Sequence, residues 1–308
     1  MKAIRLHARG GPESLRFEDA PTPRPGPGEV LVRVRAAAVT LTELLWVTTW
    51  TTRDGGPRPL PVIPGHEFSG EVAALGKGVT AVGVGEAVYG MNDWFGDGAQ
   101  AEYCLARPAD VARKPASIDH AHAAVTPISA LTAWQGLFER ARLAAGQHVL
   151  IHGAAGGVGV FAVQLARWRG VRVTATAAAG NLDFVRGLGA DEAIDYRAER
   201  FEERVRGVDA VFDTVGGDTL WRSRGVLKPG GRLVTIAASE EGSQDERTRA
   251  AFFIVEPRRA ELEEVARLID GGEVRPVVGA EFPLADALRA YRFKPARGKV
   301  VLRVGDAG

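Results

Sequence analysis

The chain has 308 residues, of which 45% are hydrophobic and 25% charged, and its formal net charge is +1. This length predicts two domains and is ample for a buried apolar core. Because the charges nearly cancel, no basic field draws nucleic acid or a membrane surface, so we expect a small-molecule substrate and neither of those partners. The opening stretch MKAIRLHARG lacks the apolar run of a signal peptide, and we therefore expect a cytoplasmic protein.

Cysteine usage limits the metal chemistry. Cys104 is the sole cysteine, which excludes an intrachain disulfide and a zinc cage built from several thiolates. We therefore expect catalysis without thiolate-bound metal.

Residues 1–120 are predicted to form the first part of a β-rich substrate domain. LRFED and EVLVRVRAAAV read as short strands on either side of PTPRPGPG, whose prolines and glycines cannot propagate a helix. More short β-type pieces follow, with glycine and proline at their corners. This pattern predicts a small barrel or sandwich.

From about residue 121 to residue 257, strand-like and helix-like stretches alternate. The predicted strands are continuous apolar runs: HVLIHGA, VRVTATA, EAIDY, VDAVFDTVG and GRLVTIAA. Such runs are typical of strands buried on both faces of a parallel sheet. The fold class is therefore α/β, with a doubly wound sheet that binds a dinucleotide at the carboxyl ends of its strands. We interpret the charged stretch EEGSQDERTR after the fifth strand as a solvated loop.

The remaining segment, residues 258–308, shows an amphipathic helix, a strand, a short helix and a final strand. We predict that it returns to the substrate domain.

The strongest functional signal is the stretch VLIHGAAGGVGVFAVQLA. Small residues between a strand and a helix let backbone N–H groups approach a pyrophosphate, and the helix N-terminus adds partial positive charge. The pattern is A-x-G-x-x-G, because an alanine replaces the first glycine. A merely close helix-to-strand turn is the less favoured alternative in this context. The predicted cofactor-binding residues of this turn are Ala154, Ala155, Gly156, Gly157, Val158 and Gly159.

Cofactor choice depends on the end of the second strand, where an NAD enzyme usually carries an acidic residue. Residues 176–181 read TAAAGN and contain no carboxylate. A carboxylate about 4 Å from a 2′-phosphate would repel it by about 4 kcal/mol at an effective dielectric of about 20, so its absence permits NADPH. We predict NADPH over NADH, and the candidate donors to its 2′-phosphate are Asn181, Arg186, Tyr196 and Arg197, which could also be ordinary surface residues.

Four stretches together resemble the medium-chain dehydrogenase/reductase superfamily, and within it the zinc-independent quinone oxidoreductase and zeta-crystallin branch. They are LPVIPGHEFSGEV, GAAGGVG, VDAVFDTVGG and ARGKVVLRV. The resemblance implies a Rossmann cofactor domain, a GroES-like substrate domain and a homodimer joined edge to edge through the cofactor domains. It also implies that Thr132 and the backbone of residues 154–158 hold the pyrophosphate, that Tyr196 lies at the adenosine end, and that Val215, Ala237, Phe253 and Ile254 flank the nicotinamide.

The chain departs from the family pattern at two places. His66 and Glu67 match a segment that zinc-dependent relatives keep, but the cysteine ligands are missing, so we interpret His66 as a hydrogen-bonded structural residue and predict no metal. Where the family often has Asn and Asp, this chain has Thr40 and Glu43, and a threonine hydroxyl offers only one short donor.

We predict hydride transfer from NADPH to a quinone or to an α,β-unsaturated ketone or aldehyde. Thr40 is the candidate to stabilise negative charge on the acceptor oxygen. An aromatic wall for the acceptor is predicted from Trp46, Trp50, Trp94 and Phe253, which could equally be packing residues. A zinc-free alcohol dehydrogenase and a non-catalytic NADPH-binding redox sensor or crystallin-like protein are the alternatives.

Overall fold

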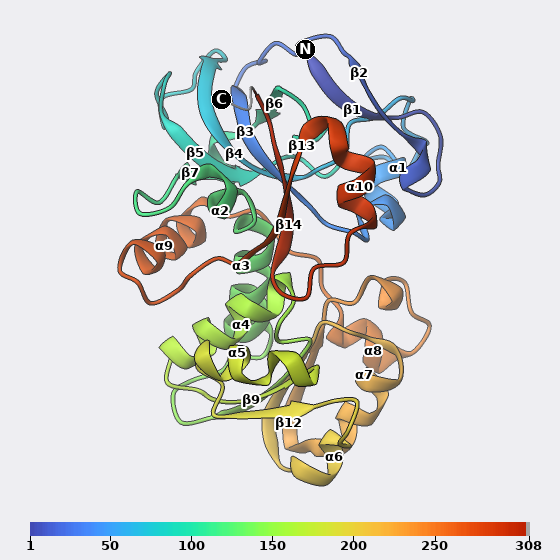
Figure 1. The fold of residues 1–308 in the computed structure, drawn as a ribbon, viewed down its shortest axis with the longest axis vertical. Helices are drawn as coiled ribbons and strands as arrows, with labels where there is room; N and C mark the ends of the chain where they lie inside the picture. The colour runs from blue at the N-terminus through green and yellow to red at the C-terminus, as the bar shows by residue number, and fades with distance from the viewer. Residues whose placement is uncertain (306–308) are drawn as a thin grey trace.

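The computed structural model describes residues 1–305. Figure 1 shows two lobes, with the N-terminus in the upper lobe and the strands and helices of the middle third of the chain in the lower lobe. Among the described residues, no helix is both long enough and apolar enough to cross a membrane.

The upper lobe is the predicted β-rich domain. Its main sheet runs in the order β13-β14-β3-β4-β5-β7, with β6 paired to β3, and a separate hairpin joins β1 and β2. In the first half of β3 (Val30–Val39), buried valines alternate with half-buried or exposed residues, as expected for a sheet with one face on the core, whereas residues 36–39 are buried throughout. The other strands are β1 (Lys2–Leu6), β2 (Leu15–Asp19), β4 (Glu67–Leu75), β5 (Ala87–Met91), β6 (Tyr103–Ala106), β7 (Val111–Arg113), β13 (Val278–Pro283) and β14 (Lys299–Arg303).

The lower lobe is a five-stranded parallel sheet in the order β10-β9-β8-β11-β12. All five predicted strands are confirmed. Apolar residues pack on both of its faces, where they form two separate clusters, as the continuous apolar runs predict. The strands are β8 (His148–His152), β9 (Arg172–Ala177), β10 (Glu192–Asp195), β11 (Val208–Asp213) and β12 (Leu227–Thr235).

Helices cover the two faces of this sheet. The larger cluster takes side chains from α3, its π-helical continuation (residues 135–140), α4, α5 and α9, and the smaller one from α6. The helices are α1 (Val47–Trp50), α2 (His120–Ala124), α3 (Pro127–Trp134), α4 (Gly157–Trp168), α5 (Leu182–Gly187), α6 (Phe201–Arg204), α7 (Gly217–Ser223), α8 (Glu246–Ala251), α9 (Arg259–Asp270) and α10 (Ala287–Arg292).

The chain returns to the upper lobe after α9. Strand β14 pairs antiparallel with β3, and β13 lies parallel to β14. Helix α9 packs on both β7 and α3, where the Tyr89 hydroxyl donates to the Leu262 carbonyl at 2.6 Å. The predicted domain divisions after residues 120 and 257 lie next to the starts of α2 and α9, and they stay predictions.

Two segments differ from the sequence interpretation. The apolar stretch after residue 120 is divided between α2 and α3, and Pro127, which has no backbone N–H to donate, begins α3 at the first position, where that N–H is not needed. The stretch EEGSQDERTR is not wholly a solvated loop: its second half enters α8, whose first turn is capped by Asp245, which accepts from Thr248 N at 2.8 Å.

Candidate active site

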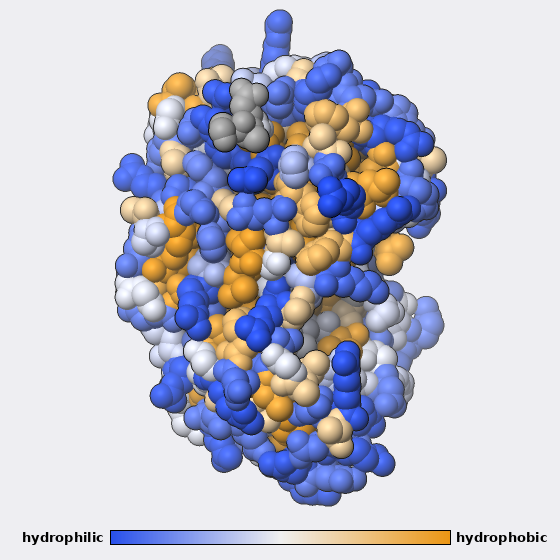
Figure 2. All heavy atoms as spheres, viewed as in Figure 1, coloured by the Kyte–Doolittle hydropathy of each residue, from blue (hydrophilic) through white to orange (hydrophobic). Residues whose placement is uncertain are grey.

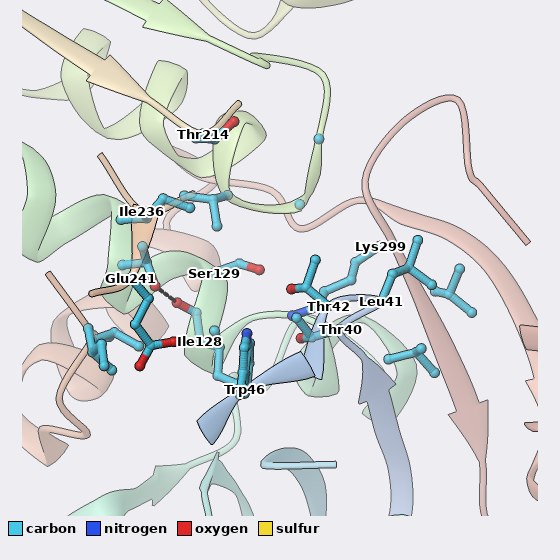
Figure 3. Close-up of a pocket in the computed structure, with 18 of the residues that line it drawn as sticks. Thr40, Leu41, Thr42, Trp46, Ile128, Ser129, Thr214, Ile236, Glu241 and Lys299 are labelled. Atoms are coloured by element: carbon cyan, nitrogen blue, oxygen red, sulfur yellow. Dashed lines mark hydrogen bonds between the residues drawn. The ribbon is translucent and has the colours of Figure 1, made fainter. Parts of the chain in front are cut away.

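A cavity of about 440 Å³ lies between the two lobes. Its walls come from the segment after β3, helix α3, the turn between β8 and α4, the ends of β11 and β12, and the start of β14. Figure 2 shows this face of the molecule hollowed between the lobes, and Figure 3 shows the side chains that point into the cavity. The carboxyl ends of parallel strands meet here, which is where doubly wound folds bind their ligands.

The turn after β8 is shaped by glycines. Gly153 has a φ of +71°, and a Cβ on it would lie 2.3 Å from Thr214 Oγ1. A Cβ on Gly159 would lie 2.2 Å from the Gly153 carbonyl oxygen, so α4 approaches the strand more closely than any side chain allows.

The start of α4 is open to an anion. No side chain caps the helix at Gly156, so the first N–H groups of α4 are available to a phosphate. Gly156, Gly157 and Val158 line the cavity, whereas Ala154 and Ala155 are buried behind the turn.

Two hydroxyl side chains of α3, Ser129 and Thr132, line the same cavity as the start of α4. Ser129 is 1% exposed and lines the cavity, and its Oγ has no hydrogen-bond partner within the described chain. A Cβ on Gly157 would lie 3.4 Å from that oxygen, so the hydroxyl is next to the open helix end. The Thr132 hydroxyl also lines the cavity and donates to the Ile128 carbonyl at 2.5 Å. An unpartnered buried hydroxyl beside free N–H groups fits the diphosphate of a dinucleotide.

Tyr196 and Arg197 lie together after β10. Tyr196 is 54% exposed, and the Arg197 guanidinium lies 5.4 Å from its ring centroid, with Nε 3.2 Å from the Tyr196 hydroxyl. The Arg186 guanidinium is held by Asp183 at 2.8 Å. Arg197 is therefore more available than Arg186 to a ligand at this end.

Asn181 is contacted by a residue that the sequence analysis missed. The Arg297 guanidinium donates from Nε to Asn181 Oδ1 at 2.8 Å and from Nη2 to the Gly180 carbonyl at 3.0 Å, and it stacks on Phe184. Asn181 in turn donates to the Ala296 carbonyl at 2.8 Å. The loop before β14 therefore places a cation at the loop after β9.

Phe253 and Ile254, which the resemblance places beside the nicotinamide, line the cavity. The two other residues expected there, Val215 and Ala237, are not on the cavity surface, and their chain neighbours Thr214 and Ile236 line it in their place.

The loop after β11 is fixed by Asp213. Its carboxylate accepts from the N–H groups of Val215 and Gly216 at 3.1 and 2.9 Å and from the Thr235 hydroxyl at 2.8 Å. Burial raises the pKa of Asp213, and these hydrogen bonds oppose that rise.

The acceptor side of the cavity contains three of the predicted residues. Thr40, Trp46 and Trp94 line it, and the two indole rings meet edge to face with centroids 5.4 Å apart. Trp50 does not reach the cavity: it is 7% exposed, packs in the core of the upper lobe and donates from Nε1 to the Leu44 carbonyl at 2.8 Å. Its expected role in substrate binding is therefore wrong, because the short helix α1 turns the ring inward.

A buried ion pair within the upper lobe lies at the cavity, and one of its members also bonds to helix α3. Lys299, whose side chain lines the cavity, pairs with Glu67, and the other Glu67 oxygen accepts from Ile128 N at 2.9 Å. Burial raises the pKa of Glu67, whereas the ammonium of Lys299 opposes the rise.

The donor set does not fit a zinc ion. His66 Nδ1 is hydrogen-bonded to Glu43 at 2.7 Å, Glu67 is occupied by Lys299, and Cys104 faces a different cavity in the upper lobe. Across residues 1–305, no group of three or more His, Cys, Asp or Glu side chains is arranged to hold a metal ion. His66 thus has the structural hydrogen bond expected of it.

Two family models match the chain. "Alcohol dehydrogenase GroES-like domain" covers residues 26–116, and "Zinc-binding dehydrogenase" covers residues 188–302. The first falls on the upper lobe, and the second begins just after α5 and covers β10 to β12 of the lower lobe and most of the return segment.

Similar proteins are oxidoreductases. A "Probable zinc-binding oxidoreductase, mitochondrial" of Arthroderma benhamiae is 32% identical over 94% of this chain and 93% of its own length. An "NADPH-dependent alkenal/one oxidoreductase, chloroplastic" of Arabidopsis thaliana is 34% identical, and the match spans 79% of this chain but 64% of that relative.

Among solved structures, the quinone oxidoreductase from Coxiella burnetii superposes with a TM-score of 0.89 at 30% identity, covering 99% of both chains. The mycobacterial Rv1454c protein complexed with NADPH gives a TM-score of 0.83 at 33% identity, covering 99% of this chain and 100% of that one.

The fold and the cavity define a two-lobed, dinucleotide-binding oxidoreductase. With these relatives, the chain belongs to the medium-chain dehydrogenase/reductase superfamily, in its quinone oxidoreductase-like part.

Proposed function

We propose that the protein reduces a quinone or an α,β-unsaturated carbonyl compound with NADPH and without zinc. The observation that carries the proposal is that the open end of α4 and the Trp46–Trp94 pair face one cavity. A dinucleotide held at the first can therefore meet a flat acceptor held at the second. The names of the Arabidopsis, Coxiella and mycobacterial proteins support this reaction class and this cofactor.

The described residues divide the work of the reaction. The N–H groups at the start of α4 and the Ser129 hydroxyl would bind the diphosphate, and Phe253 would pack beside the nicotinamide. NADPH, when bound, supplies the hydride. The Thr40 hydroxyl would donate to the acceptor oxygen as negative charge develops there. A conjugated acceptor spreads that charge, so a single neutral donor suffices.

NADPH preference is supported by Arg297, whose guanidinium reaches from the loop before β14 to the loop after β9. Arg297 uses Nε and Nη2 on Asn181 and Gly180, which holds the guanidinium in place and leaves Nη1 for a 2′-phosphate. Arg197 and Tyr196 would approach from the loop after β10. Charge-assisted hydrogen bonds of this kind contribute about 1.5–3 kcal/mol each.

Zinc independence is supported by the chemistry of the donors. Glu67 is neutralised by Lys299, so its carboxylate is not free to bind a metal ion. Of the other buried imidazole and carboxylate atoms around His66, only His66 Nε2 and one Glu43 oxygen lack a hydrogen-bond partner within the described residues. A catalytic zinc ion usually takes three protein ligands. The proposed reaction therefore has no step at a metal ion.

A homodimer formed through β12 is part of the proposal. This strand is the last of the five-stranded sheet, and within the described residues its outer edge makes a single bridge, from Thr235 to Phe252. Such an edge can pair with a second copy. Light scattering gives the test, because a single-chain mass would contradict the homodimer.

The predicted cytoplasmic location stays a prediction, since the two curated relatives are described as mitochondrial and chloroplastic.

The test is turnover with NADPH against a panel of quinones and a parallel panel of enones and enals. We expect oxidation of NADPH with at least one panel, and full activity after dialysis against a chelator. NADPH that carries deuterium at C4 of the reduced nicotinamide should place the label on the β-carbon of an enone product. Tight NADPH binding without turnover of either panel would favour the redox sensor, and activity restored only by added zinc would contradict the proposal.

A further inference from the structure

The cavity contains an acidic side chain that the reaction does not use. Of the described residues that line it, two are ionisable, Glu241 and Lys299. Lys299 is neutralised by Glu67. Within residues 1–305, neither an ion pair nor a hydrogen bond engages the Glu241 carboxylate. The cavity therefore carries one uncompensated negative charge.

The backbone around Glu241 is fixed. The neighbouring Glu240 donates its N–H to the Ala237 carbonyl at 2.9 Å, and its side chain accepts from Gly217 N at 2.9 Å. Ser243 N–H donates to the Glu240 carbonyl at 3.2 Å. These bonds hold the segment after β12 in a turn from which Glu241 reaches the cavity.

The Glu241 carboxylate is directed toward the acceptor side. Figure 3 shows the side chain extending from the β12 side of the cavity toward Ile128 and Trp46. The neutral polar groups on this side are the indole rings of Trp46 and Trp94 and the hydroxyls of Thr40, Thr42 and Thr48. Lys299 lies beside Thr40 and Thr42, but its ammonium is already paired with Glu67, so no unpaired cation among the described lining residues could offset a negative charge on an acceptor.

We propose that Glu241 determines acceptor specificity by excluding anionic acceptors, so that the cavity admits uncharged or cationic ring compounds. This inference rests on the proposed reductase function. An anionic acceptor would meet the carboxylate in a confined, mostly apolar space, where charges are screened less than in water. A cationic ring would be attracted both by the carboxylate and by the faces of the two indoles.

The test compares a matched acceptor pair, 1,4-naphthoquinone and its 2-sulfonate. The measured quantity is kcat/KM for the sulfonate divided by kcat/KM for the neutral quinone, compared between wild type and variant so that intrinsic reactivity cancels. We expect this ratio to rise about fivefold to tenfold in Glu241→Gln, the effect of a unit charge about 7 Å away at an effective dielectric of about 40. Glu241→Lys should raise it further, and added salt should shrink both effects.

Glu246→Gln is the control, because Glu246 lies five residues further on, at the exposed start of α8, and does not line the cavity. Its ratio should equal that of the wild type. An unchanged ratio in both Glu241 variants, with the neutral quinone still reduced, would overturn the inference and leave the proposed function intact. Wild-type protein that turns over neither acceptor, although it binds NADPH, would instead contradict the proposed function itself.

Discussion

The two halves of the cavity are built in different ways. The cofactor half is made mainly from backbone: glycines that permit a close turn and the free N–H groups at the start of α4. The acceptor half is made from side chains on short irregular segments, among them Thr40, Trp46 and Glu241. A backbone site tolerates no added atoms, whereas a side-chain site can change its ligand by exchanging one residue. We therefore expect substitutions at the glycines of the first half to abolish cofactor binding, and exchanges of single side chains in either half to change affinity, rate or selectivity by smaller amounts.

The largest effect is expected from Gly159→Val in the cofactor half. A Cβ there would lie 2.2 Å from the Gly153 oxygen and 2.6 Å from Ala154 Cα, and backbone cannot move aside as a side chain can. NADPH binding, measured by fluorescence titration, should fall below detection. Gly187→Ala is the control, because a Cβ on this α5 residue meets nothing within 4 Å. That control should gain about 0.5–1 kcal/mol of stability through helix propensity. Normal NADPH affinity in Gly159→Val would refute the backbone account.

The next largest effect is expected from Lys299→Met, which breaks the buried ion pair at the cavity wall. Removing the ammonium leaves the buried Glu67 carboxylate unpaired, which should lower the free energy of unfolding by about 3–5 kcal/mol at neutral pH. Burial raises the pKa of Glu67 in the folded protein above its unfolded value. Lys299 opposes that rise, so in Lys299→Met the folded-state pKa of Glu67 is higher still. The folded variant therefore keeps the Glu67 proton to a higher pH than the folded wild type, and the loss of stability should be smallest in acid and grow as the pH rises.

Urea denaturation at several pH values measures this loss. Lys228→Met is the matched control, since Lys228 pairs with Asp209 at the surface and should contribute less than about 1 kcal/mol. A second substitution, Glu67→Leu, should restore much of the lost stability. A deficit that does not vary with pH would show that the charge on Glu67 is not its cause.

A smaller effect is expected from Arg297→Gln, at the adenosine end of the cofactor half. Loss of its charge-assisted hydrogen bonds should weaken NADPH binding about 10- to 150-fold, with little change for NADH. Calorimetry with both cofactors measures the ratio of their dissociation constants. Arg186→Gln is the control, because Asp183 already holds Arg186. If Arg186→Gln reduces the NADPH preference and Arg297→Gln does not, the assignment of the 2′-phosphate donor is wrong.

The smallest effect is expected in the acceptor half, from Thr40→Val. Losing one neutral donor to the acceptor oxygen should reduce kcat about tenfold with little change in KM, as expected for an interaction made mainly in the transition state. Thr48→Val removes another hydroxyl of the same cavity and should leave kcat within about twofold. Should the two variants exchange these outcomes, Thr48 and not Thr40 is the donor.

The sequence predicts the lobes and the cofactor turn well because their signals are local. Apolar runs predict the five parallel strands, and the glycine turn lies within a single stretch between a strand and a helix. The prediction fails where a contact is distant along the chain. Arg297 meets Asn181 across 116 positions, and no pattern near either residue indicates the pair.

Side-chain direction is the second limit on prediction. Trp46 and Trp50 stand four residues apart in similar surroundings, yet one lines the cavity and the other packs in the core. Ser129 looks like any small residue of a buried helix. Glu241 lies in a charged stretch typical of solvated loops, and only the packing of that loop against the cavity distinguishes it.

One backbone contact has a consequence for biosynthesis. The Gly298 N–H donates to the Ala155 carbonyl at 2.8 Å, and Gly298 forms a bridge with Gly156, so the start of β14 lies along the cofactor turn. On the ribosome, the nucleotide-binding turn emerges long before the residue that completes it. A nascent chain halted before Gly298 therefore contains every glycine of the turn but lacks the neighbour that lies along it, and we expect such a chain to bind the coenzyme more weakly.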